Sequence, residues 1–183
     1  ENELYMTEKM SAHALMANVS DYPSEAIEKA TKDLMLVEFH DILPGSAIEP
    51  VGEYAQAVAG HGLTELRPEK IKAFLALCSD KAKAEDGTIP VFVYNPHPYE
   101  VDETVEVEFQ LPDQNKNPAL YSVPHVYSGG VEIPCQREHE MSNFNVDWRI
   151  KTVFFAKLPA GTMSRFDIKM VLCENPQPPV QPE

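Results

Sequence analysis

The sequence predicts an α+β protein of two domains, a three-helix bundle followed by an antiparallel β-sandwich-like domain. In the first half, Ala, Glu, Lys, Leu and Met dominate and apolar residues recur at helical spacing. The second half alternates apolar and polar residues, as in TVEVEF and VFFAKL, between turns rich in Pro and Gly. The short polar link KAEDGT separates these halves, so we expect domains at 1–84 and 88–174 and a Pro-rich tail at 175–183.

The first two helices follow from apolar spacing and capping residues. We expect the first over about residues 2–18 and the second from Ser24, which is a good N-cap residue. The second helix carries an apolar stripe that ends at Val37, and His40 continues this stripe three residues later. The His40 ring should therefore point inward or across the helix end. The earlier members of the stripe are Ala26, Ala30 and Leu34.

A tight corner is predicted where the second helix ends. Pro44 disfavours helical geometry at Leu43, and Gly45 allows a sharp reversal of the chain. Ser46 and Glu49 have the S-x-x-E spacing of a capping box, so a third helix should begin at once. This arrangement would hold the corner rigid.

Composition excludes several classes of partner. The formal charge of −14, from 29 acidic against 15 basic residues, and the lack of a basic run argue against nucleic acid and anionic membranes. No apolar run has the length of a membrane span, and the start ENELYMTEKM has neither a signal sequence nor an initiator Met. Three widely spaced cysteines form no disulfide framework, which favours a reducing, cytoplasmic location. We expect a piece of a longer protein.

His40 and Asp41 are the candidate site residues, and the pattern alone leaves two interpretations open. A single histidine on an apolar helical face is usually a hydrogen-bonded core residue, and an aspartate at a corner usually caps a helix. Alternatively, an imidazole and a carboxylate held at a rigid corner are suited to binding a metal ion and a polar substrate. The spacing of the apolar residues by itself favours the first interpretation, in which His40 packs in the core and Asp41 caps a helix.

The segment FHDILPGS (39–46) resembles the middle-domain motif of glycoside hydrolase family 38, the retaining α-mannosidases. The similarity extends to YPSEAIEKATKDLMLVEFHDILPGS, to IPVFVYNPHPYEVDETVEVEF, and to the strands around SGGVEIPCQ and VFFAKLPAGTMSRFDI. The resemblance covers nearly the whole chain, but it is loose outside HDILPGS. The clearest departure is GHGLTELRP (60–68), where the family commonly runs a longer, uninterrupted helix.

This resemblance implies that the chain is part of a metal-dependent α-mannosidase that hydrolyses terminal α-mannosides of glycans. His40 would bind the divalent metal, typically zinc, and Asp41 would bind hydroxyls of the mannose. An N-terminal α/β domain of the same chain would supply a His-x-Asp pair of ligands and the nucleophile. No histidine in this sequence has Asp two positions later. We therefore expect no catalytic residue in this fragment, and no activity when it is isolated.

A second function class stays open, in which the chain is a noncatalytic carbohydrate-binding or interaction module. A homo-oligomer is also left open.

If Asp41 receives sugar hydroxyls, its carboxylate must keep free lone pairs. It should then face an open surface and form no buried ion pair with lysine or arginine.

Weaker constellations favour structural roles. A metal set with H-x9-C-x3-H spacing matches no established ligand pattern; its members are His125, Cys135 and His139. A sugar-stacking platform is less expected than core packing for the aromatic residues Tyr121, Tyr127 and Trp148. A solvated sheet face is predicted for the acidic residues that lie among the valines, which are Glu100, Asp102, Glu106 and Glu108.

Overall fold

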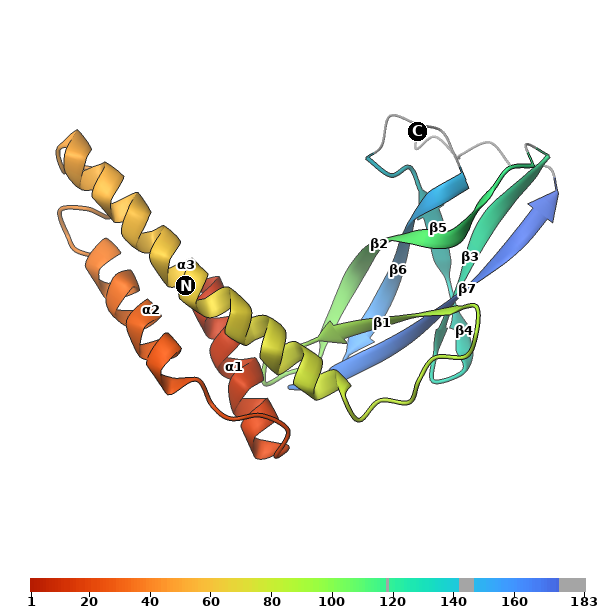
Figure 1. The fold of residues 1–183 in the computed structure, drawn as a ribbon, viewed down its shortest axis with the longest axis horizontal. Coiled ribbons are helices and arrows are strands. Elements are labelled where there is room, and N and C mark those ends of the chain that lie inside the picture. Colours follow the sequence, from red (N-terminus) through yellow and green to blue (C-terminus); the bar gives the residue numbers. More distant parts are fainter. Residues whose placement is uncertain (118, 142–146, 175–183) are drawn as a thin grey trace. The chain divides into compact units, whose positions relative to one another are not determined.

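A computed structural model describes residues 1–117, 119–141 and 147–174. The chain divides into two compact units, residues 1–81 and 82–183. Three helices are followed by strands that pair antiparallel, which confirms the predicted fold class (Figure 1). The predicted Pro-rich tail lies outside the described residues.

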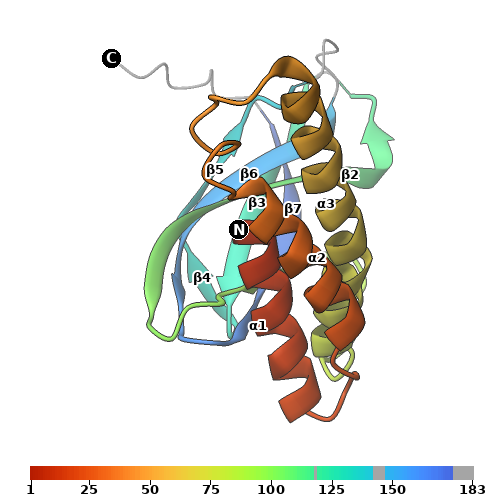
Figure 2. The ribbon, with the colours of Figure 1, turned by 90° about the vertical axis from the view of Figure 1, so that its left-hand side faces the viewer.

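The helical unit is built around its longest helix, α3 (Glu49–Cys78), which packs against both α1 (Asn2–Met16) and α2 (Ser24–Val37). Helices α1 and α2 make few contacts with each other, and Figures 1 and 2 show both lying along α3. The core is made of small residues and a few large ones: Met10, Ala14, Ala30, Ala55, Leu66, Ala73 and Leu77. Within the described residues, no helix combines the length and apolar character that a bilayer span requires.

The helix ends differ from the predicted ones by a few residues. Helix α1 ends at Met16 because Asn18 adopts a left-handed conformation (φ 58°), and the Val19 amide then bonds to the Ala14 carbonyl at 3.0 Å. Ser24 is not the N-cap of α2, because Pro23 occupies that position and no side chain caps the helix.

The predicted capping box at the start of α3 is wrong. The N-cap is Ile48, and no side chain caps this end. The Ser46 hydroxyl instead donates to the backbone carbonyl of Asp41 at 3.3 Å, so Ser46 stabilises the corner rather than the helix. Helix α3 continues without interruption through residues 60–68, with Pro68 inside it.

The β unit contains two antiparallel sheets. Four strands pair in the order β1-β7-β3-β4, and three pair in the order β2-β6-β5. The strands are β1 (Thr88–Tyr94), β2 (Val101–Asn115), β3 (Leu120–Ser128), β4 (Val131–Ile133), β5 (Cys135–Glu138), β6 (Asp147–Leu158) and β7 (Met163–Glu174).

Side chains from both sheets form one core, as a sandwich requires. The Phe154 ring of β6 lies 4.9 Å from the Phe166 ring of β7, centroid to centroid. The remaining buried members of this cluster are Val126, Ala156, Leu158 and Ile168. Alternation along β6 and β7 therefore buries one face of each strand, which is what the period-two pattern predicts.

Asn95 ties the loop after β1 to the turn between β6 and β7. Its side-chain amide is buried and donates to the carbonyls of Tyr99 and Leu158, each at 2.9 Å, and to that of Pro159 at 3.2 Å. Its side-chain oxygen accepts from the His97 amide at 3.0 Å. One polar residue thus satisfies several backbone groups that would otherwise be unpaired.

A second polar cluster lies between the sheets around Asp147. Its carboxylate accepts from the Ser122 amide and hydroxyl, both at 2.8 Å, from the Asn115 amide at 3.0 Å and from Arg137 at 2.9 Å. Burial alone would raise the pKa of Asp147, but these hydrogen bonds and the Arg137 charge outweigh it and lower the pKa. The ionised carboxylate therefore stabilises the β unit.

Candidate functional site

The candidate site is the corner at residues 38–48, which joins α2 to α3. Helix α2 ends at Val37 because the Phe39 amide bonds to the Leu36 carbonyl, only three residues back, at 3.2 Å. The Phe39 carbonyl then accepts from two amides, those of Ile42 at 2.8 Å and Leu43 at 3.0 Å. These bonds wind the chain into tight turns in place of a further helical turn.

Gly45 completes the corner. Its amide donates to the Ile42 carbonyl at 3.0 Å, and its backbone adopts a left-handed conformation with φ 74°. A residue with a Cβ atom would be strained in this conformation. The Pro-Gly pair therefore reverses the chain as predicted, although the helix has ended before Pro44 is reached.

His40 lies outside α2, and its side chain is 79% exposed. The prediction that its ring continues the apolar stripe and points inward is therefore wrong. It lies three residues beyond the last helical residue, Val37, so helical periodicity no longer sets its direction. Its ring lies against that of Phe39, with centroids 4.3 Å apart, and its Nε2 is 3.6 Å from Oδ1 of Asp41.

The Asp41 side chain is 65% exposed. Among the described residues, no lysine or arginine lies within ion-pair distance of it, and its neighbour is the imidazole of His40. This exposure agrees with the expectation that the Asp41 side chain reaches an open surface. The two candidate side chains are thus adjacent and available to a ligand.

A set of exposed apolar side chains around the corner was missed at the level of sequence. Large apolar residues near His40 and Asp41 are 42–71% exposed: Met35, Leu36, Phe39, Leu43 and Ile48. We call these five residues the apolar rim. The signal was present in the run LMLVEFHDIL, because so many apolar residues cannot all lie on the one face of a helix that is buried.

The corner offers one imidazole and one neighbouring carboxylate to a metal ion. A protein zinc site normally has three or four protein ligands. The described part of the chain contains no group of three or more His, Cys, Asp or Glu side chains placed to hold a metal. One imidazole and one carboxylate are thus fewer ligands than a zinc site normally has.

The alternative metal set is not assembled. His125 Nδ1 lies 2.6 Å from Glu132 Oε1, and the Cys135 thiol donates to the Pro124 carbonyl at 3.2 Å. Burial raises the pKa of the Cys135 thiol, which keeps it protonated and a poor metal ligand. His125, Cys135 and the exposed His139 are therefore structural or surface residues in this fold.

The three aromatic residues considered as a sugar platform also lie apart. Tyr121 and Tyr127 are on β3, whereas Trp148 is on β6 of the other sheet. Trp148 is 41% exposed and its ring nitrogen donates to the Leu111 carbonyl at 3.0 Å. Tyr127 lies six positions beyond Tyr121 on the strand, or about 20 Å, so the three residues form no common stacking surface.

The predicted solvated acidic face is present on β2. Glu106 pairs with Lys151 at 2.8 Å, and Glu108 pairs with Arg149 of the adjacent strand β6. Such cross-strand pairs stabilise a sheet modestly. This face therefore contributes to the fold and has no arrangement suited to catalysis.

Comparison with known proteins connects the helical unit to one family. Residues 1–72 match the family model described as the alpha mannosidase middle domain. The comparison with curated proteins gave no match.

Two solved structures from Enterococcus faecalis share the fold of the chain. One is a protein in glycosyl hydrolase family 38, with a TM-score of 0.66 and 17% identity over 92% of this chain. The other is an alpha-mannosidase from strain V583, with a TM-score of 0.61 and 15% identity over 92% of this chain. The chain spans 23% and 22% of their respective lengths.

Proposed function

We propose that this chain is part of a retaining, metal-dependent α-mannosidase, because residues 1–72 match the family model of the alpha mannosidase middle domain. The enzyme would hydrolyse terminal α-mannosides of glycans. The observation that carries the proposal is the corner between α2 and α3, where His40 and Asp41 lie side by side and exposed on a turn closed by Gly45.

In this proposal His40 is one ligand of a divalent metal, typically zinc. A neutral imidazole is a good zinc ligand, and the His40 ring is accessible. The bound metal would coordinate vicinal sugar hydroxyls and so favour the axial 2-hydroxyl of mannose. The contact with the Phe39 ring and the tight turns of the corner restrict the orientation of the imidazole before the metal binds.

Asp41 is proposed to accept hydrogen bonds from hydroxyls of the mannose. An ionised carboxylate is an acceptor with several lone-pair positions, and no lysine or arginine of the described residues pairs with Asp41. Its proximity to His40 would place the sugar next to the metal. Substrate orientation, rather than chemistry at the scissile bond, is therefore the role assigned to Asp41.

The apolar rim supports the proposal that another domain completes this site. Five large apolar side chains around an otherwise polar corner are more typical of an interface than of a free surface. We propose an N-terminal α/β domain of the same protein as the covering domain. It would bring further metal ligands and the two carboxylates that a retaining glycosidase needs as nucleophile and acid/base.

A reducing, cytoplasmic location is part of this proposal. All three cysteines of the chain carry free thiols, which a disulfide-forming compartment would put at risk of oxidation. Fractionation of the source cells, followed by detection of the chain with an antibody, tests this location.

The test uses a full-length protein that contains this chain. It should hydrolyse an aryl α-mannoside, lose this activity to a chelator, and regain it with a divalent cation. His40→Ala should lower metal affinity about 10-fold or more. Asp41→Asn should leave the metal content unchanged and lower turnover and sugar binding.

Two variants serve as matched controls for the site substitutions. His139→Ala and Asp102→Asn change exposed residues of the β unit and should alter neither metal content nor hydrolysis. If His40→Ala kept the metal content and the activity of the unmodified protein, the proposed role of His40 would be wrong. A metal-free protein that binds glycans without hydrolysing them would instead support the noncatalytic module.

A further inference from the structure

A cluster of charged residues joins α2 to α3 outside the proposed site. Nδ1 of His61 on α3 lies 2.6 Å from Oδ2 of Asp33 on α2. The Asp33 side chain is 21% exposed and that of His61 is 56% exposed. The other charged groups that face His61 are Glu65 of α3, at 3.9 Å from Nε2, and Lys29 of α2, which lies 3.6 Å from Glu65.

The contact lies where the two helices approach each other closely. At Gly62 an added Cβ atom would be 3.4 Å from both Cβ and Oδ2 of Asp33 and 3.7 Å from Cα of Ala30. Ala30 is itself buried. Two small residues therefore allow the helix backbones to come together, and this brings the imidazole of His61 within reach of Asp33.

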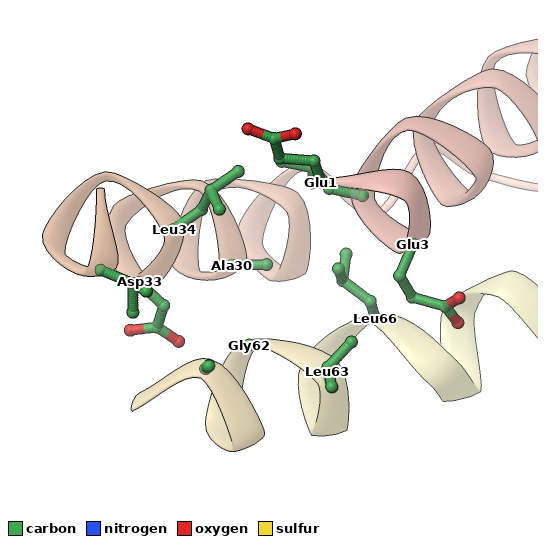
Figure 3. A pocket seen from close by; sticks show the side chains of 11 residues that line it. Glu1, Glu3, Ala30, Asp33, Leu34, Gly62, Leu63 and Leu66 are labelled. Atoms are coloured by element: carbon green, nitrogen blue, oxygen red, sulfur yellow. The ribbon is translucent and has the colours of Figure 1, made fainter. Parts of the chain in front are cut away.

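Figure 3 shows Asp33 and Gly62 facing each other at one end of a cavity of about 180 Å³ between the helices. Leu34, Leu63 and Leu66 line the same cavity. Such a space leaves the end of α2 with fewer packing contacts than a filled core would provide. Polar contacts then contribute a larger share of what holds the end of α2 on α3.

Asp33 is also close to the candidate site along the chain. It precedes Val37, the last residue of α2, by about one helical turn, and the corner with His40 and Asp41 follows directly. A displacement of this turn relative to α3 would therefore move the corner as well. The His61–Asp33 contact is in a position to control that displacement.

We propose that the hydrogen bond between His61 and Asp33, which we call the clasp, depends on protonation and positions the end of α2, and with it His40 and Asp41. His61 is thus a positioning residue whose protonation state affects the geometry of the corner. The relevance to mannoside hydrolysis rests on the proposed function, whereas the coupling between the clasp and the corner does not.

The direction of the pH dependence follows from the charges. The hydrogen bond and the negative charge of Asp33 raise the pKa of His61 above its ordinary value of 6.5, and Glu65 adds to this effect. Loss of hydration at His61 and the Lys29 charge oppose it. A raised folded pKa means that the stabilisation is fully present below pH 6.5 and is lost as pH rises through the folded pKa.

The experiment is a pH titration of the 183-residue chain followed by NMR. It uses a His40→Gln background, so that the corner carries no imidazole of its own. We expect His61 to titrate with a pKa above 6.5 and the backbone amides of Ile42 and Gly45 to change shift with the same midpoint. Asp33→Asn should return the His61 pKa toward 6.5 and remove the titration step at the corner.

Each variant has a defined outcome. The control Asp80→Asn changes an exposed aspartate of the same unit and should leave both titrations unchanged. An ordinary His61 pKa would overturn the clasp itself. The pKa of His61 could be raised while the amides of Ile42 and Gly45 titrate in the same way whether His61 is present or replaced in His61→Gln. That result would overturn the positioning role of His61. None of these results depends on metal binding or hydrolysis, so each is separate from the test of function.

Discussion

Replacing Asn95 by Ala should destabilise the β unit strongly for a single loop position, because the Asn95 side chain is buried. The buried side chain makes hydrogen bonds of 2.9 Å to the carbonyls of Tyr99 and Leu158 and accepts one of 3.0 Å from the His97 amide. Each intramolecular hydrogen bond contributes about 0.5–1.5 kcal/mol net, and a buried group left unpaired costs more. We expect the free energy of unfolding to fall by about 2–4 kcal/mol.

Urea denaturation followed by tryptophan fluorescence measures this loss. The chain has a single tryptophan, Trp148, which lies on β6 and therefore reports on the β unit. The midpoint should shift to lower urea while the slope of the transition stays the same, because the surface exposed on unfolding is unchanged.

The matched control is Asn117→Ala. Asn117 is exposed, and its side-chain oxygen accepts one local hydrogen bond from the Ala119 amide at 3.0 Å. This change should cost no more than about 1 kcal/mol. If Asn95→Ala and Asn117→Ala lowered the free energy of unfolding equally, Asn95 would not be the residue that ties the loop to the turn.

Three further changes probe the corner, the helical core and the polar cluster of the β unit. Gly45→Ala should destabilise the helical unit by about 1–2 kcal/mol because its φ of 74° disfavours a Cβ atom. Gly52→Ala, in the first turn of α3 where an added Cβ atom meets nothing, should stabilise it; helical circular dichroism during urea denaturation measures both. Leu66→Ala should cost about 2–5 kcal/mol by the same assay because Leu66 is 3% exposed, whereas Leu75→Ala, at 61% exposed, should cost little. The pKa of Asp147 is lowered in the folded protein. Its contribution to the free energy of unfolding is therefore present above pH 3.8 and is lost as the pH falls through the folded pKa. Urea denaturation followed by Trp148 fluorescence should then show that acidification lowers the urea midpoint of the unmodified protein more than that of Asp147→Asn. An equal fall in the two proteins would contradict this.

Much of the fold could be predicted because its causes are local in sequence. The alternation of VFFAKL places Phe154 and Ala156 on the buried face of β6 in any sheet that covers one side. In the same way, the left-handed conformation of Gly45 follows from the Pro-Gly pair and its neighbours. Helix content, strand alternation and turn positions therefore needed no knowledge of distant contacts.

The candidate residues were also found from sequence, but their environment was not. The helical period of the stripe ending at Val37 was extended to His40, although α2 stops at Val37. The helix ends there because the Phe39 amide bonds to the Leu36 carbonyl, and no single residue in the sequence signals this bond. The exposure of His40, Phe39 and Leu43 follows from this early end, whereas Met35 and Leu36 lie on the exposed side of α2 itself.

The sequence by itself determined the fold class and singled out His40 and Asp41 as the candidate pair, because periodicity and a contiguous motif are properties of neighbouring residues. Tertiary structure alone decided which distant groups meet. Asp33 and His61 are 28 residues apart, and their contact exists because Gly62 and Ala30 let two helix backbones approach. Asn95 likewise bonds to Leu158, 63 residues away, across a turn whose position depends on the pairing of whole strands. Long-range contacts depend on packing geometry, which local propensity does not encode.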